Sequence, residues 1–199
     1  QRTVSAEKAP NKPSFISINF KNGDPVGING KKYNPEKILT KLNLIAGKNG
    51  IGRVDLVENR FLGIKSRGVY ETPGGTLLIH AHRAIESVTL DKNTMHKKDS
   101  IMSRYAELIY NGYWFSKERF KLQKIVDLKR NKVNGAVKLK LYKGNIIIQS
   151  RITKSKAYSV KKVSFEENKS FNKSNVEKFI NFHKIFILTF FTITHCRLN

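Results

Sequence analysis

Charged and phenolic side chains gather in residues 54–75, the stretch VDLVENRFLGIKSRGVYETPGG. The polar residues alternate with apolar ones that would anchor the backbone; they are Glu58, Arg60, Lys65, Ser66, Arg67 and Tyr70. A carboxylate, a base and a phenol on a loop between rigid elements are typical of a small-molecule binding site. The residue types alone do not identify the ligand.

Two interpretations of this stretch are open from the residues. In the first, the Glu58 carboxylate accepts a charge-assisted hydrogen bond from an ammonium group, while Tyr70 offers a hydroxyl and an aromatic wall. In the second, Glu58 forms a surface ion pair with Arg60 or Arg53, and Tyr70 is a half-buried packing residue. Without further information the second interpretation is preferred.

Hairpins are predicted on both sides of the stretch. The alternation of Ile16, Ile18 and Phe20 indicates a strand over 14–20, followed by a short meander with two Asn-Gly turns. A second hairpin is predicted over residues 133–141 and 146–150, with one apolar face toward the core and one solvent-exposed face.

Helices are predicted between these hairpins. Asn34 and Pro35 are a suitable cap and first residue for a helix that is expected to end at Gly47. Further helices are predicted over 77–88, 103–110 and 117–129, and short strands over 54–57 and 61–64. Because hairpins and helices are segregated along the chain, the predicted fold class is α+β, an antiparallel sheet and hairpins with packed helices.

A glycine cluster at 47–52 has the wrong order for a nucleotide-binding loop. Such a loop follows a strand and opens a helix, whereas Gly47, Gly50 and Gly52 follow a predicted helix and precede a strand. We therefore expect a helix stop and a tight turn here.

The formal net charge is +23, from 38 Lys and Arg against 15 Asp and Glu, which favours attraction to polyanions. The lysines are scattered, and the sequence has no arginine-rich arm or aromatic-basic motif, so specific nucleic-acid recognition is not expected. The alternative function is a non-catalytic basic binding or scaffold module that binds nucleic acid. Such a module should concentrate its lysines on one face and bind with a steep salt dependence.

The remaining composition favours a globular domain without metal or membrane anchor. At 199 residues the chain can bury roughly 70% of its unfolded surface. Its single cysteine, Cys196, excludes an internal disulfide and fits a cytoplasmic location. His80 and His82 point in different directions on the predicted helix, so no metal site is expected. The apolar run at 185–193 is shorter than the ~20 residues that a membrane span needs.

The stretch VENRFLGIKSRGVYETPGG resembles the argininosuccinate synthase family. Other segments of the chain resemble the family in the same order; they are PNKPSFISINF, NPEKILTKLNLIAGKNGIGRVDLVENR, YAELIYNGYWFSKERF and VKLKLYKGN. The resemblance covers residues 3–182, and the family's amino-terminal domain has no counterpart here.

The resemblance implies a ligase of arginine biosynthesis that condenses citrulline and aspartate to argininosuccinate, with release of AMP and pyrophosphate from ATP. ATP with Mg²⁺ is expected in the amino-terminal domain, whose Ser-Gly-Gly-x-Asp loop does not occur in this sequence, so the chain alone is expected to be inactive. Glu58 of VENR and Tyr70 of GVYE match the residues that hold citrulline. No catalytic, cofactor-binding or metal-binding residue is expected in this chain.

The resemblance also implies a division into two parts. Residues 1–165 would form the synthetase domain, with the citrulline side of the site and a multimerisation surface. Residues 166–199 would form a protruding carboxy-terminal helix that joins subunits of a homotetramer, here ending in a divergent apolar tail. No membrane partner is expected.

Overall fold

The computed structural model describes residues 2–154, 177–178 and 181. The chain divides into two compact units, Gln1–Tyr158 and Ser159–Asn199. The fold below is that of the first unit. The predicted oligomerisation helix and its apolar tail at 166–199 lie almost entirely outside the described residues, and that division of the chain stays a prediction.

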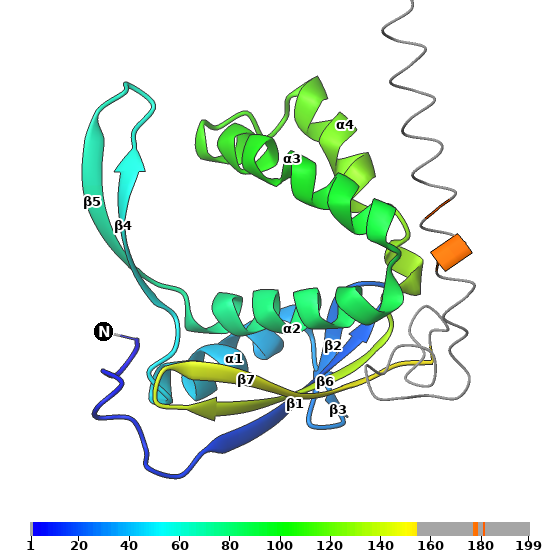
Figure 1. Cartoon of the computed structure of the whole chain (residues 1–199). Helices are drawn as coiled ribbons and strands as arrows, with labels where there is room; N and C mark the ends of the chain where they lie inside the picture. Colours follow the sequence, from blue (N-terminus) through cyan, green and yellow to red (C-terminus); the bar gives the residue numbers. More distant parts are fainter. Residues whose placement is uncertain (1, 155–176, 179–180, 182–199) are drawn as a thin grey trace, which may run out of the picture. The chain divides into compact units, whose positions relative to one another are not determined.

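Five antiparallel strands form the main sheet, in the spatial order β3-β2-β1-β6-β7 (Figure 1). Their bounds are Ser14–Lys21 for β1, Asp24–Ile28 for β2, Lys31–Lys32 for β3, Gly135–Tyr142 for β6 and Asn145–Ile152 for β7. The central pair joins the two predicted hairpins, because Ser14 of β1 lies opposite Leu141 of β6. The two ends of the domain therefore share one sheet.

Two helices cover the apolar face of this sheet. They are α1, Pro35–Lys48, and α2, Pro73–Thr89, and they pack against each other. The core between helices and sheet contains fully buried Ile18, Leu42, Leu77, Ile85 and Leu139. Burial of such side chains is the main favourable contribution to folding.

A second pair of helices lies beyond α2 (Figure 1). These helices are α3, Lys92–Tyr110, and α4, Lys117–Val126, and a short 3₁₀ turn, Arg130–Lys132, leads back to the sheet. The predicted start of α3 at residue 103 is wrong. Asp91 caps the helix by accepting a hydrogen bond from the Thr94 backbone N–H at 3.0 Å. The prediction missed the first half of α3 because that half is rich in lysine and shows no clear helical period of apolar residues. The predicted end of α4 is also wrong, because Lys129 adopts a left-handed φ of 55°.

The start of α1 and the glycine cluster after it are as predicted. Asn34 Oδ1 accepts a hydrogen bond from the Lys37 backbone N–H at 2.9 Å, and Pro35 is the first helical residue. The helix ends at Lys48, and the chain then turns through Gly52, which has a φ of +101°. A side chain at Gly52 would place its Cβ 2.3 Å from the Pro73 Cα atom, so only glycine fits this close approach.

A separate hairpin joins α1 to α2 and projects away from the main sheet (Figure 1). Its strands are β4, Arg53–Asn59, and β5, Lys65–Glu71. The predicted strand at 61–64 is wrong, because these residues form the hairpin turn. The Arg60 N–H donates to the Ile64 carbonyl, and the Gly63 N–H donates back to the Arg60 carbonyl, both at 2.8 Å. The prediction failed because apolar residues such as Leu62 suggested a strand, whereas Leu62 is 80% exposed in this turn.

The observed class is α+β, as predicted, with antiparallel sheets of five and two strands. Within the described residues, none of the helices combines the length and the apolar character that a membrane span requires.

Candidate functional site

The β4–β5 hairpin sorts the predicted site residues onto two faces. Glu58 lies opposite Ser66 in the hairpin, and Tyr70 is four residues along β5 from Ser66. Because side chains alternate along a strand, Glu58, Ser66 and Tyr70 share one face. Lys65 and Arg67 belong to the other face. The structure therefore brings together the two residues predicted to hold a ligand.

The opposite face carries a self-contained ion pair. Arg67 Nε donates to Asp55 Oδ1 at 2.9 Å, and its Nη2 donates to Oδ2 at 2.5 Å. This hydrogen bonding lowers the pKa of Asp55 and raises the pKa of Arg67. Both side chains are exposed, so the pair contributes little to stability. On this face Asp55 and Arg67 are therefore already paired with each other.

Glu58 is the most buried acid of the hairpin, with a side chain that is 15% exposed. Its Oε2 atom lies 3.3 Å from Arg60 Nη1. The ion pair expected in the second interpretation therefore exists, whereas Arg53 pairs with Glu71 at 3.3 Å. Glu58 Oε2 is nevertheless buried without a hydrogen bond of good geometry among the described residues. A buried acceptor in this state is costly, and a donor from a ligand would satisfy it.

Tyr70 is 40% exposed and shares its face of the hairpin with Glu58, whose carboxylate perturbs the pKa of the Tyr70 hydroxyl. Hydrogen bonding to Glu58 is the first cause that raises the pKa of Tyr70; burial and the negative charge of Glu58 act in the same direction, while Arg60 opposes them. The phenol therefore stays protonated at neutral pH. A neutral hydroxyl can donate to Glu58 and accept from a ligand at the same time.

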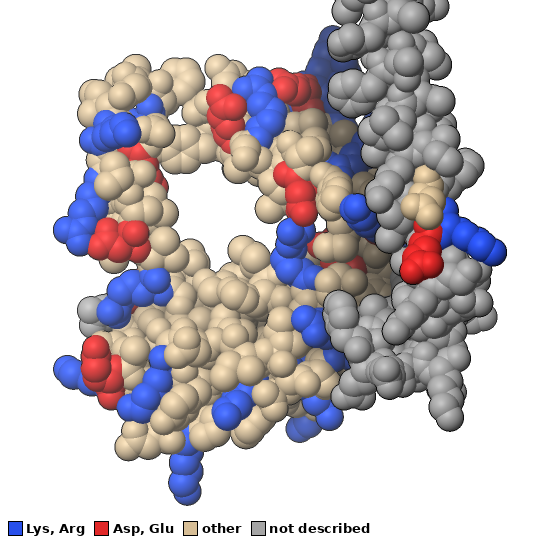
Figure 2. Space-filling model, viewed as in Figure 1, with Lys and Arg blue, Asp and Glu red and all other residues tan. Residues whose placement is uncertain are grey.

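Arg60 is held beside Glu58 by two further contacts. Its Nε donates to Ser66 Oγ at 2.6 Å, and its Nη1 donates to Tyr110 Oη at 3.5 Å. The hydrogen bond with Tyr110, followed by the charges of Tyr110 and Glu58, raises the pKa of Arg60. Tyr110 ends α3, so the hairpin face meets that helix. Figure 2 shows an opening between the hairpin, α2 and the α3–α4 pair.

Tyr110 was not predicted as a site residue. It lies far along the chain from the hairpin, and only the packing of α3 brings it to Arg60. No local pattern in the sequence indicates this contact.

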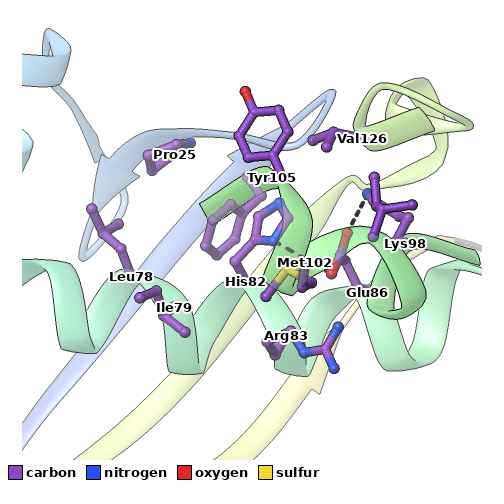
Figure 3. A pocket seen from close by; sticks show the side chains of 12 residues that line it. Pro25, Leu78, Ile79, His82, Arg83, Glu86, Lys98, Met102, Tyr105 and Val126 are labelled. Carbon is purple, nitrogen blue, oxygen red and sulfur yellow. Dashed lines mark hydrogen bonds and ion pairs between the residues drawn. The ribbon is translucent and has the colours of Figure 1, made fainter. Parts of the chain in front are cut away.

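A cavity of about 360 Å³ between α2, α3 and the β1–β2 hairpin is a second candidate (Figure 3). Its lining is mostly apolar and includes the buried carboxylate of Glu86. Lys98 Nζ donates to Glu86 Oε1 at 2.6 Å, and His82 Nδ1 lies 3.5 Å from Oε2. His82 also packs edge-on against Phe20, with ring centres 5.7 Å apart. The Glu86 carboxylate is thus paired with Lys98 and lies within ion-pair distance of His82.

The pKa of Glu86 reflects this pairing. Burial alone would raise the pKa, but hydrogen bonds and charge from His82 and Lys98 outweigh it and lower the value to about 2. We therefore interpret the cluster as structural. Among the described residues, no three His, Cys, Asp or Glu side chains are placed to hold a metal ion.

The start of α2 does not fit the phosphates of a nucleotide. The Gly74 N–H already donates to Asn43 Oδ1 at 2.8 Å, and Pro73 has no N–H to offer. A phosphate site at a helix start needs free backbone amides. Two of the amides that a phosphate site would use are therefore missing or occupied, and we interpret Gly74 and Gly75 as structural residues rather than as a nucleotide loop.

Basic side chains are dispersed on the face drawn in Figure 2. Lys and Arg are spread over the elements and interleaved with Asp and Glu. This face does not support the alternative of a module that concentrates its lysines for nucleic-acid binding.

Comparison with known proteins gives one consistent result. The family model described as "Arginosuccinate synthase C-terminal domain" matches residues 1–190. An argininosuccinate synthase of Pelagibacter ubique is 81% identical over 184 residues, which are 92% of this chain and 47% of that protein. Those of Rhodospirillum centenum and Cereibacter sphaeroides are 52% and 57% identical, over 45% and 41% of their lengths. The chain spans about half the length of these curated relatives, and it belongs to the argininosuccinate synthase family.

Proposed function

We propose that this chain forms the citrulline-binding wall of an argininosuccinate synthase, a cytoplasmic ligase of arginine biosynthesis that joins citrulline to aspartate and releases AMP and pyrophosphate from ATP. One observation carries the proposal. The buried Glu58 Oε2 lacks a hydrogen bond of good geometry, and Glu58 shares a hairpin face with Tyr70, whose pKa it raises, next to the contact of Arg60 with Tyr110 of α3. The relatives that share these residues' segment bear this enzyme's name.

The residues of the hairpin would bind and orient the substrate. The ammonium group of citrulline would donate to Glu58 Oε2, a charge-assisted hydrogen bond that a carboxylate accepts well. The Tyr70 hydroxyl would accept a second hydrogen bond, and its ring would exclude water from one side. Arg60, fixed by Ser66 and Tyr110, would keep the Glu58 carboxylate in place before the substrate arrives.

ATP with Mg²⁺ and aspartate belong, in this proposal, to the part of the enzyme that this chain does not cover. The start of α2 does not fit a nucleotide, which supports that assignment. ATP would activate the ureido group of citrulline, and the residues of this chain would hold the amino-acid end. We expect the complete enzyme to be a homotetramer and the chain alone to lack synthase activity.

The test uses a complete enzyme in which this chain replaces the matching part of the Pelagibacter ubique relative, which is 81% identical. Pyrophosphate release is measured while citrulline and ATP are varied separately. Glu58→Gln keeps the side-chain shape but removes the charge, so the KM for citrulline should rise roughly 10- to 100-fold, as expected for a hydrogen bond to a charged group. The KM for ATP should change by less than about twofold.

Asp55→Asn is the matched control, because it removes a carboxylate from the opposite face of the same hairpin. It should leave the KM for citrulline within about twofold of the original value. A Glu58→Gln enzyme with an unchanged KM for citrulline, or with equal rises for citrulline and ATP, would refute the assignment. Turnover by the chain alone would show that the nucleotide chemistry resides here.

A further inference from the structure

Gly68 lies under the ring of Tyr70 on the hairpin face that carries Glu58. It pairs with Leu56 of β4 and is two residues before Tyr70, so its missing side chain would point to the same side. A Cβ atom at position 68 would lie 2.5 Å from Tyr70 Cε2 and 2.9 Å from both Cζ and Oη. The three nearest atoms all belong to the outer end of that one ring.

The backbone does not explain a glycine at this position. Gly63 in the hairpin turn and Gly52 before the hairpin have positive φ values of 79° and 101°, which favour glycine. Gly68 is not among the residues with positive φ. It sits in regular antiparallel pairing inside β5, where glycine weakens a strand and marks a close approach. The close approach here is that of the Tyr70 ring.

We propose that Gly68 is a positioning residue for the site: its lack of a side chain lets the Tyr70 ring lie along β5, so that the hydroxyl reaches Glu58. The inference deepens the proposed function and rests on it only for the substrate measurement. An alanine at position 68 would push the ring away from the strand. Because the ring is the outer end of a rotatable side chain, it can move without unfolding the hairpin.

The first experiment uses the 199-residue chain itself and needs no substrate. Carbon-13 labelled tyrosine is titrated by NMR, and Tyr70→Phe identifies the Tyr70 signal. Separation of the hydroxyl from Glu58 removes the main cause of its raised pKa, so Gly68→Ala should lower the pKa of Tyr70 toward the ordinary value for tyrosine.

Gly75→Ala is the control, because a Cβ there would meet only Thr72 Cβ at 3.9 Å. It should leave the Tyr70 titration unchanged. An unchanged Tyr70 titration in Gly68→Ala would overturn the inference, whatever the function of the protein.

The second experiment uses the complete chimeric enzyme. Gly68→Ala should raise the KM for citrulline about tenfold, with the KM for ATP changed less than about twofold. In a Tyr70→Phe background the same alanine should add less than about a twofold change, because the hydroxyl that it would displace is already absent. Equal effects of the alanine in both backgrounds would contradict a role through the hydroxyl.

The two experiments separate the inference from the proposed function. A shifted Tyr70 titration in Gly68→Ala supports the positioning role. If Tyr70→Phe and Glu58→Gln then leave the KM for citrulline unchanged, the positioning role stands and the citrulline assignment fails.

Discussion

Replacement of Glu86 by glutamine should destabilise the protein strongly at neutral pH. Glu86 is buried on α2 and paired with Lys98 of α3, whose side chain is 13% exposed. Glutamine keeps the size of the side chain but leaves the Lys98 ammonium without its counter-charge. Loss of one member of a buried pair is costly for this reason.

The magnitude follows from the pKa of Glu86. It falls from an ordinary 4.5 to about 2 in the folded protein, because His82 and Lys98 outweigh the opposing effect of burial. Since each pKa unit corresponds to about 1.4 kcal/mol, the ionised form contributes about 3 kcal/mol to the free energy of unfolding. A folded pKa below the unfolded one means that this contribution is complete above pH 4.5. It is lost as the pH falls to about 2.

The assay is urea unfolding of the chain, followed by circular dichroism at several pH values between 2 and 7. Other carboxylates also titrate in this range, so the quantity of interest is the difference in unfolding free energy between the original protein and Glu86→Gln. That difference should be about 3 kcal/mol at pH 7 and should shrink steadily below pH 4.5.

Asp99→Asn is the matched control, because the Arg83–Asp99 pair links the same two helices. Both of its side chains are more than 40% exposed, so its loss should cost less than about 1 kcal/mol. A Glu86→Gln difference that is equally small, or that does not change between pH 4.5 and 2, would refute the reasoning.

Two further substitutions test the fold by the same urea assay. Asn34→Ala removes the hydrogen bond to the Lys37 N–H at the start of α1 and should cost about 1 kcal/mol; an unchanged unfolding midpoint would rule out a capping role. Leu42→Ala leaves a cavity at a fully buried position of α1 and should cost about 2–5 kcal/mol, whereas a loss below about 1 kcal/mol would mean that the core collapses around the smaller side chain.

The sequence predicted correctly those elements whose signals, such as caps and alternation, lie within the element itself. The cap and first-turn proline of α1 are local, and so is the alternation of β1, and both predictions were confirmed. The strand at 61–64 was wrong because periodicity cannot distinguish exposed apolar residues in a turn from buried ones in a strand. The backbone hydrogen bonds of Arg60 and Gly63 show that residues 61–64 form the hairpin turn.

Contacts between residues far apart in the sequence could not be predicted from such local signals. The pairing of β1 with β6 and the approach of Tyr110 to Arg60 depend on packing of the whole unit. Glu58 and Tyr70 were identified through the resemblance, and their shared face follows from strand alternation. Gly68 could have been noticed from its place two residues before Tyr70 on that face.

The β4–β5 hairpin has a sheet of its own, apart from the core that α1 and α2 bury against the main sheet. In the proposed function, recognition lies in the hairpin and stability in the core, and a hairpin of this kind can open locally while the core stays folded. Replacements on the hairpin face are therefore expected to change the proposed citrulline binding while the main sheet and its helices keep their fold. Side chains on the hairpin face can therefore change without a change in the fold of the main sheet and its helices.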